Sequence, residues 1–206
     1  MTRLLIATTN PAKLAEYRLL LGGFALELIS LAEAGIAEKP EETGRTFAEN
    51  ALLKARFYFA RAGFPTLADD GGLEVDALGG EPGLKSHRWL GAGENSDREL
   101  ADMVIRRMEG VEDRRRAARL RAAVALVWRS DGKVRERVAE AAIEGVIAHR
   151  AYPEIRPGFP YRAVLYLPER KSFLGELGDE AEAQTSQRRI ALESLRTDLE
   201  RIARSD

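Results

Sequence analysis

Two adjacent carboxylates, Asp69 and Asp70, are the residues of this chain best suited to catalysis. They follow the apolar stretch Thr66–Ala68, which is typical of a short buried strand, and they precede Gly71 and Gly72. We interpret the two acids and two glycines as a loop that can approach a ligand closely. The acids should point in different directions, so that one can hold a divalent cation and orient a water while the other bonds the loop. An ordinary turn is the alternative interpretation.

Two lysines fall on predicted helices where an anion would explain them. Asn10 as N-cap and Pro11 at the first helical position predict a helix over residues 11–21, with Lys13 in its first turn. A cation is unfavourable there unless an anion such as phosphate is also present. A capping box at Thr46 predicts a second helix, which extends to Gly63. Lys54 lies on one side of this helix, among alanines and aromatic residues. A solvated surface lysine is the alternative at both positions.

The arginine-rich stretch 114–121 is the one candidate for a nucleic-acid patch. No aromatic residue interleaves the arginines, and the pattern over residues 117–128 is that of a strand, so we favour a structural role. Asp131-Gly132 predicts a hairpin turn into a second strand from Val134, and residues 143–148 predict a further strand.

The remaining positions divide into elements that position the candidate residues. We predict strands over 4–7, 24–31 and 163–167, and a polar loop over 37–45 in which Glu42 could ligate a metal. A helix is predicted from a capping box at Ser96 to Gly110, with four apolar residues on one face, namely Leu100, Met103, Val104 and Met108. Helical structure is also predicted over 176–203, with Ser186 as N-cap, Arg188 and Arg189 in its first turn, and an apolar stripe of Ile190, Leu195, Leu199 and Ile202. Phe159 and Tyr161 end a proline-rich loop, where they could stack on a base or fill a core.

Composition limits the class of protein. The chain has 206 residues, 45% hydrophobic and 32% charged, which predicts one soluble folded unit over residues 1–206. No apolar run approaches the roughly 20 residues needed to span a bilayer, and we expect neither a signal peptide nor membrane binding. The chain has no cysteine, which excludes a thiolate metal site and fits a cytoplasmic location. Its two histidines, His87 and His149, are far apart in sequence, which argues against a histidine-rich metal site. A net charge of -1 provides no general attraction to nucleic acid.

In order and spacing these motifs resemble the inosine triphosphate pyrophosphatase family, house-cleaning enzymes that hydrolyse non-standard purine nucleoside triphosphates to the monophosphate and pyrophosphate. The matching blocks are Thr8-x-Asn10-x-x-Lys13, then Glu42-Thr43-Gly44-x-Thr46-Phe47-x-Glu49-Asn50-Ala51-x-x-Lys54-Ala55, then Ala68-Asp69-Asp70 and Val75-Asp76-Ala77-Leu78-x-Gly80-x-Pro82-Gly83-x-x-Ser86. The resemblance spans nearly the whole chain. It implies an α/β fold with a mixed, twisted sheet flanked by helices, two lobes around a central cleft, and a homodimer.

The resemblance also implies roles for particular residues. Asp70 would be the general base or water-orienting acid, with Asp69 beside it, and Glu42 and Asp70 would hold Mg²⁺. The triphosphate would be bound by residues of the first two blocks, namely Thr8, Thr9, Asn10, Lys13 and Lys54, and by the backbone of Gly71, which stands where the family usually has serine.

The departures from the family lie where it recognises the base. The block Gly-Phe-Gly-Tyr-Asp-Pro is here Gly158-Phe159-Pro160-Tyr161-Arg162-Ala163, and the Lys-Asn and Ser-His-Arg elements are Glu182-Ala183 and Ser186-Gln187-Arg188. We expect Phe159, Tyr161, Arg162, Glu182, Gln187 and Arg188 to contact the substrate. Arg162 and Glu182 could form a reversed ion pair, or Arg162 could contact the base directly.

The sequence therefore predicts magnesium-dependent pyrophosphohydrolysis of non-standard purine nucleoside triphosphates such as ITP, dITP and XTP. Two alternatives remain open at this point. One is a nucleotide-binding member of the family that has lost turnover, and the other is the same chemistry on a different modified nucleotide.

Overall fold

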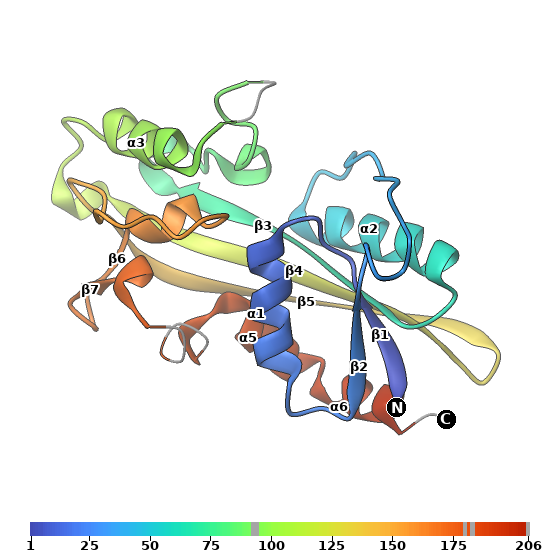
Figure 1. Ribbon diagram of the computed structural model, residues 1–206. Helices are drawn as coiled ribbons and strands as arrows, with labels where there is room; N and C mark the ends of the chain where they lie inside the picture. Colours follow the sequence, from blue (N-terminus) through green and yellow to red (C-terminus); the bar gives the residue numbers. More distant parts are fainter. Residues whose placement is uncertain (92–94, 179–180, 182–183, 205–206) are drawn as a thin grey trace. The chain divides into compact units, whose positions relative to one another are not determined.

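A computed structural model describes residues 1–91, 95–178, 181 and 184–204 of the chain (Figure 1). Among these residues a seven-stranded sheet has the order β2-β1-β3-β4-β5-β6-β7. Its strands are β1 Thr2–Ile6, β2 Leu26–Ser30, β3 Thr66–Val75, β4 Ala117–Ser130, β5 Lys133–Ile147, β6 Leu165–Leu167 and β7 Ser172–Phe173. The sheet is mixed, because β1 pairs in parallel with β2 and β3 while β6 pairs antiparallel with β5 and β7. The predicted α/β class and mixed sheet are confirmed.

The helices begin close to where their capping residues predict. The described α-helices are α1 Pro11–Leu21, α2 Phe47–Ala62, α3 Asp97–Arg107, α5 Gln187–Ser194 and α6 Arg196–Ala203, and the short 3₁₀ helices are η1 Asp76–Leu78, η2 Gly83–Lys85, η3 Asp113–Arg115, η4 Pro160–Ala163 and η5 Leu174–Glu176. The Ser96 capping box of α3 is complete. The box predicted at Thr46 is only half formed, because the Glu49 carboxylate accepts from the Arg45 N–H instead of returning to Thr46.

The chain divides into two compact units. The first unit comprises Met1–Asp70, Ala122–Ala141 and Arg188–Asp206, and the second comprises Gly71–Arg121 and Ala142–Gln187. The boundary between them falls within β3, β4 and β5 along the chain. The single domain with a central cleft stays a prediction.

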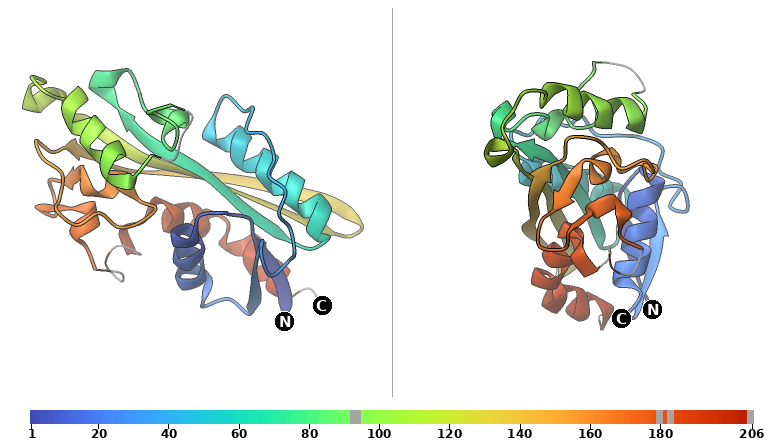
Figure 2. Two further views of the ribbon diagram at one scale, coloured as in Figure 1. Left: turned by 45° about the horizontal axis from the view of Figure 1, so that its top comes forward. Right: turned by 90° about the vertical axis from the view of Figure 1, so that its left-hand side faces the viewer.

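In the first unit, helices cover both faces of the sheet. Leu4 and Ile6 of β1 and Leu67 of β3 belong to one buried cluster with side chains of α1, α5 and α6. Leu5, which is fully buried, points to the opposite face because side chains alternate along a strand. Figure 2 shows α2 on that side of the strands, and α1 and α5 on the other. Consecutive residues of a strand in this unit therefore contact different helices.

The second unit has its own core around α3. Leu100 and Val104 of this helix and Met108 at its C-cap are buried, as predicted, and pack with strand residues and with Tyr161 of η4. Met103, predicted on the same face, is only partly buried. The Tyr161 hydroxyl donates a hydrogen bond to the backbone carbonyl of Ser86. Within the described part of the chain, no helix combines the length and apolar character needed to cross a membrane.

The loop predicted at residues 69–72 is wrong, because all four residues belong to β3. The glycine signal has another cause at Gly72. A Cβ on this residue would lie 2.1 Å from Ser86 Oγ and 2.6 Å from the Gly83 carbonyl oxygen, so the strand needs glycine to pass close to η2. The Ser86 hydroxyl in turn accepts from the Leu73 N–H at 3.1 Å.

Three further boundaries differ from the sequence prediction. The strands expected from Val134 and over 143–148 are one strand, β5, because its neighbour β4 is 14 residues long and its buried backbone groups need partners. β6 begins only at Leu165, since η4 occupies residues 160–163. From Gln187 onward, the described residues of the C-terminal pattern form two helices, α5 and α6, separated at Leu195, and Ile190 is 46% exposed instead of lying on the buried stripe.

Candidate active site

The strand geometry of β3 separates the two carboxylates of the pair. Asp69 and Asp70 are consecutive on β3, so their side chains point to opposite faces of the sheet. Asp69 contacts residues of α1 and α5, and Asp70 contacts residues of α2. The prediction that the acids point apart is confirmed, although a strand rather than a loop is the reason. Each acid therefore has its own partners.

Asp69 is the centre of a buried ion network. Its Oδ2 lies 3.0 Å from Lys13 Nζ and 3.0 Å from Arg188 Nε, and its side chain is only 1% exposed. Arg188 also contacts Glu16, with Nη1 3.2 Å from Oε2. Lys13 and Glu16 are one turn apart on α1, and Arg188 lies in the first turn of α5. Asp69 thus joins the starts of two helices to β3, and its carboxylate is shared by the two cations, with Glu16 as a second acid beside Arg188.

The charges of this network shift the pKa values of its members. Burial raises the pKa of Asp69, but Lys13 and Arg188 outweigh it and hold this pKa well below its usual range. Burial lowers the pKa of Lys13, and the charge of Asp69 opposes this only in part. Burial also lowers the pKa of Arg188, but Asp69 and Glu16 outweigh it and raise this pKa above its usual value. Asp69 is therefore a carboxylate at neutral pH.

Asp70 has a more open environment, and α2 supplies its partners. Asp70 Oδ1 lies 3.1 Å from Lys54 Nζ, and its Oδ2 accepts from Asn50 Nδ2 at 3.1 Å. The same Lys54 nitrogen lies 3.1 Å from Glu42 Oε1. The side chains of Lys54 and Asp70 are each 13% exposed, and that of Glu42 is 33% exposed. Two carboxylates from distant parts of the sequence therefore share one ammonium group.

Asn50 holds this part of the site in place. Its Oδ1 accepts from the Gly44 N–H at 2.8 Å, which fixes the orientation of the amide and leaves Nδ2 to donate to Asp70. A Cβ on Gly44 would lie 2.6 Å from Asn50 Oδ1, so glycine is needed for this close approach. Because Gly44 belongs to the loop that carries Glu42, one amide fastens that loop and orients Asp70.

Lys54 keeps its charge in this environment. Burial lowers its pKa, but the carboxylates of Asp70, Asp69 and Glu42 outweigh burial and raise the pKa above its usual value. Neither lysine is the solvated surface residue that the sequence left as the alternative, because the Lys54 side chain is 13% exposed and Lys13 is 7% exposed. Both lysines are largely buried beside carboxylates in the first unit.

The predicted phosphate loop forms the start of α1. Asn10 Oδ1 accepts from the N–H groups of Ala12 and Lys13, and Thr8 Oγ1 accepts from the Asn10 N–H at 3.1 Å. Together with Thr9, these residues line a cavity of about 460 Å³ in the first unit. The Thr8 and Asn10 side chains thus shape the loop. Their predicted contacts with the triphosphate stay predictions, as does the role of Gly71 within β3.

The carboxylate pair fits a magnesium ion that also binds phosphate. Among the described residues, no group of three or more His, Asp or Glu is placed to hold a metal. Magnesium is commonly bound through only one or two carboxylates, with water and substrate phosphates completing its shell. Glu42 and Asp70, which already share one cation, supply that number of hard oxygen ligands.

The candidate base-binding residues lie in the second unit, apart from Arg188. Arg162 is 3% exposed and stacks on Phe159, with its Cζ 3.6 Å from the ring centroid. Tyr161 fills the core, and Gln187 is 3% exposed. Glu182 lies outside the described residues, so the ion pair proposed for Arg162 stays a prediction.

Sequence reasoning missed three residues of the site. Asn50 stands within a motif block but received no role, and its position one turn before Lys54 on α2 was the available signal. Glu16 follows Lys13 by one turn of α1, which could have suggested a shared partner. Tyr17 is fully buried, and burial together with the nearby charge of Asp69 raises its pKa well above the usual value.

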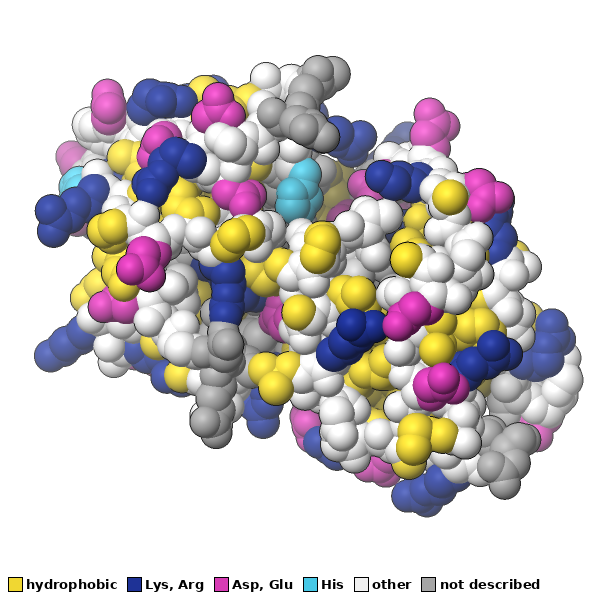
Figure 3. Space-filling model, in the orientation of Figure 1, with side chains coloured by type: hydrophobic (Ala, Val, Ile, Leu, Met, Phe, Trp, Pro, Cys, Tyr) yellow, Lys and Arg dark blue, Asp and Glu magenta, His cyan; other side chains and the backbone are white. Residues whose placement is uncertain are grey.

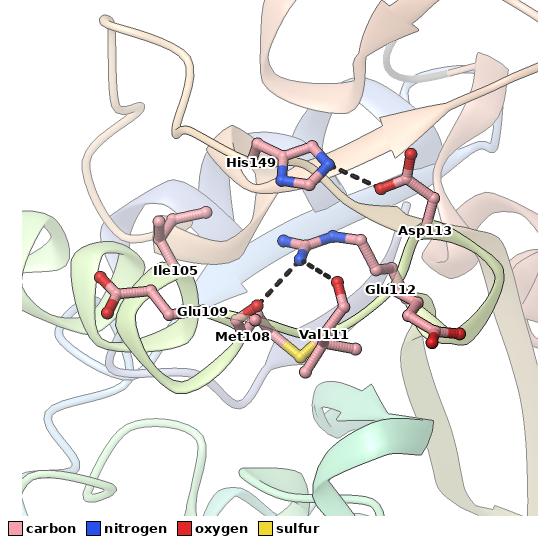
Figure 4. Close-up of a pocket in the computed structure, with 9 residues that line it drawn as sticks. Ile105, Met108, Glu109, Val111, Glu112, Asp113 and His149 are labelled. Carbon is pink, nitrogen blue, oxygen red and sulfur yellow. Dashed lines mark hydrogen bonds and ion pairs between the residues drawn. The ribbon is translucent and has the colours of Figure 1, made fainter.

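A second cavity, of about 580 Å³, lies in the second unit near the arginine-rich stretch (Figure 4). The Arg116 guanidinium is buried there and donates to four backbone carbonyls, those of Met108, Val111, Ile147 and Ala148. His149 and Asp113 contact each other at the exposed edge. Arg119 and Arg121, in β4, form ion pairs with acidic side chains. This stretch therefore has the structural role predicted from its strand pattern.

Comparison with known proteins places the chain in a family. The model of the Ham1 family matches residues 4–198. A dITP/XTP pyrophosphatase of Geobacillus kaustophilus is 40% identical over 202 residues, covering 98% of this chain and 96% of that protein. One from Thermus thermophilus is 39% identical over 193 residues, covering 94% and 89%. The structure of a HAM1 protein from Coxiella burnetii matches with a TM-score of 0.82 at 33% identity, covering 97% and 98%. The resemblance found in the sequence is confirmed, and the chain belongs to the Ham1 family.

Proposed function

We propose that this chain is a nucleoside triphosphate pyrophosphohydrolase acting on non-standard purine nucleotides of the dITP and XTP type. Its relatives are named for dITP and XTP, and they match it over nearly their whole length. The observation that carries the chemistry is the cluster of Glu42, Asp70 and Lys54 in the first unit, with Lys13 near it. In the reaction, water attacks the α-phosphorus, the bond from that phosphorus to the oxygen bridging to the β-phosphate breaks, and pyrophosphate leaves with the monophosphate as second product.

The residues of the chain divide this work among them. Asp70 orients the attacking water and receives its proton. Lys13 and Lys54 bind phosphate oxygens, and their positive charges stabilise the charge that develops in the transition state. Glu42 and Asp70 would hold magnesium, which when bound neutralises the phosphates and polarises a phosphoryl oxygen. Asp69 acts through Lys13 and Arg188, because both cations contact its carboxylate.

The carboxylate pair in the first unit indicates a catalytic protein rather than one that only binds nucleotides. Binding a triphosphate needs cations, and Lys13 and Lys54 supply them. It does not need Asp70, a carboxylate held by Asn50 beside a second acid, which would repel the phosphates unless a metal intervened. Turnover is the better account of this pair. The base is a separate question, since Arg162 and Gln187 differ from the family pattern.

A panel of nucleoside triphosphates tests the proposal. Pyrophosphate release from dITP, XTP, ITP, GTP, ATP and dUTP is measured with Mg²⁺ and with EDTA, alongside Asp70→Asn. We expect release from dITP and XTP to exceed that from ATP by orders of magnitude, to need Mg²⁺ and to be nearly lost in the variant. Binding without release by the wild type would support the non-catalytic alternative. Release confined to dUTP would move the chemistry to another modified nucleotide.

The proposal extends to partners and compartment. A homodimer is proposed from the family resemblance and is tested by light scattering on the purified protein. A cytoplasmic location is supported by the absence of cysteine from the sequence. On the face shown in Figure 3, basic and acidic side chains are interspersed, which supports a small-molecule substrate over nucleic acid.

A further inference from the structure

The ammonium group of Lys54 lies between the two carboxylates that the proposed function assigns to magnesium. Its Nζ is 3.1 Å from Glu42 Oε1 and 3.1 Å from Asp70 Oδ1. A divalent cation bound to the same pair would take oxygens that this ammonium now contacts. Two cations between one pair of carboxylates would repel each other strongly in a partly buried site. Lys54 and the metal therefore compete for these oxygens.

The carboxylates can stay in place when the ammonium moves. Asp70 keeps its second contact, the Asn50 amide at 3.1 Å from Oδ2, and the Asn50 amide also fastens the Glu42 loop through Gly44. Lys54 itself has a flexible stem of four carbons, so its charged end can turn without movement of α2. The geometry thus combines one acid held by an amide, a second acid on a loop fastened by the same amide, and one movable cation.

We propose that Lys54 is a built-in counter-cation that holds Glu42 and Asp70 ready for magnesium and gives way to it only when a triphosphate is present. This inference rests on the proposed function, because it concerns the metal site of that reaction. Without nucleotide, the ammonium neutralises the acid pair and opposes a divalent ion. A bound triphosphate offers the ammonium phosphate oxygens instead and so frees the carboxylates. Metal and triphosphate then favour each other's binding, as reciprocal linkage requires.

The role differs from that of a simple phosphate ligand in one measurable respect. If Lys54 only bound phosphate, removing its charge would leave metal binding to the nucleotide-free protein almost unchanged. If it is a counter-cation, removing its charge takes away the ammonium group that the two carboxylates share and makes the pair a stronger metal site. Lys54 is thus a positioning residue as well as a phosphate ligand.

The test measures binding of Mn²⁺, as a magnesium probe, to the full-length nucleotide-free protein by electron paramagnetic resonance. Lys54→Met is expected to bind Mn²⁺ at least tenfold more tightly than the wild type, and Lys54→Gln should do the same if the methionine variant folds poorly. Lys54→Arg, which keeps the charge, should stay close to the wild type. Arg56→Met is the matched control, because it removes one positive charge from the same helix at an exposed residue that pairs with Glu136.

The outcomes separate this inference from the proposed function. Equal or weaker Mn²⁺ binding by both neutral variants overturns the inference. An equal gain in Arg56→Met also overturns it, since the effect would then be a general one of net charge. If the wild type releases pyrophosphate from dITP with Mg²⁺ but the variants gain no affinity, only the inference fails. If the wild type releases no pyrophosphate from any nucleotide, the proposed function fails whatever the metal affinities.

Discussion

Replacing Asp69 with asparagine should harm the fold more than the same change at Asp70, although the two acids are neighbours. Asp69 Oδ2 receives both Lys13 and Arg188, whose side chains are 9% and 5% exposed. An asparagine there removes the negative charge from beside both buried cations, while the Glu16 carboxylate still lies 3.2 Å from Arg188. Breaking a buried ion pair on one side costs about 3 to 5 kcal/mol. At roughly 2 to 4 °C per kcal/mol for a chain of this size, the melting temperature should fall by about 6 to 20 °C.

Asp70→Asn gives the matched comparison. The amide can still accept from Asn50 and the Asp70 side chain is 13% exposed, so the expected loss of stability is under about 2 kcal/mol. Its kcat should nevertheless fall on the order of 10²-fold or more, because an amide neither takes a proton nor holds a metal as a carboxylate does. Urea unfolding and pyrophosphate release are measured on both variants. The reasoning is refuted if Asp69→Asn unfolds at the wild-type midpoint, or if Asp70→Asn keeps near-wild-type turnover.

Three other perturbations test separate parts of the structure. In an NMR titration, Lys13 should lose its proton below the ordinary lysine pKa of 10.5, and Lys54 should lose its proton above it. The stability that charged Lys54 contributes is therefore lost as pH rises through its folded pKa, whereas the free-energy cost of burying charged Lys13 disappears when that lysine loses its proton. Gly72→Ala should destabilise the chain by about 1 to 3 kcal/mol, because its Cβ would overlap the Ser86 hydroxyl and the Gly83 carbonyl oxygen, whereas Gly23→Ala has open space. Arg116→Met should cost about 3 kcal/mol or more, because four buried or partly buried backbone carbonyls lose this donor.

Each of these has an outcome that contradicts it. Identical midpoints for the two lysines would show that their environments do not differ as described. Equal stability of the two glycine variants would remove the close approach to η2. For Arg116, the control is Arg114→Met, an exposed arginine of the same stretch that should cost almost nothing. Similar losses from both arginines would return the effect to net charge.

Helix starts were the most predictable part of the fold because they depend on local chemistry. The Asn10 side chain starts α1 by accepting hydrogen bonds from backbone N–H groups two and three residues later, and Pro11 occupies the first helical position. The Ser96 side chain starts α3 in the same way, through the N–H of Glu99. The strand identity of residues 69–72 was not predictable in this way. It depends on the contact between Gly72 and Ser86, 14 positions along the chain, and glycine locally favours a turn as much as a close approach.

In the site, too, the identities of several residues could be predicted from the sequence, but their contacts could not. Glu42, Lys54 and Asp70 could be named from their motifs, and the structure brings them together. The contacts among them could not be predicted, since nothing in the spacing indicates that one ammonium lies between two acids. Asn50 was missed because a buried amide has no distinctive pattern. Its role follows only from the loop that its oxygen accepts from and the carboxylate that its nitrogen reaches.

The alternation of β3 also limits how this gene region can change in length. Deleting a single residue just before Asp69 would shift the strand by one position and exchange the faces of the two acids. The Asp69 carboxylate would then move away from the buried cations Lys13 and Arg188, and the Asp70 carboxylate would move away from Lys54 on α2. Leu67, which packs on the α1 side as Asp69 does, could keep its place only if the two acids changed faces. Substitutions in this strand can be tolerated one at a time, but a one-residue insertion or deletion would disturb the core and the site together, so length here should vary far less than in the surface turn at Asp131-Gly132.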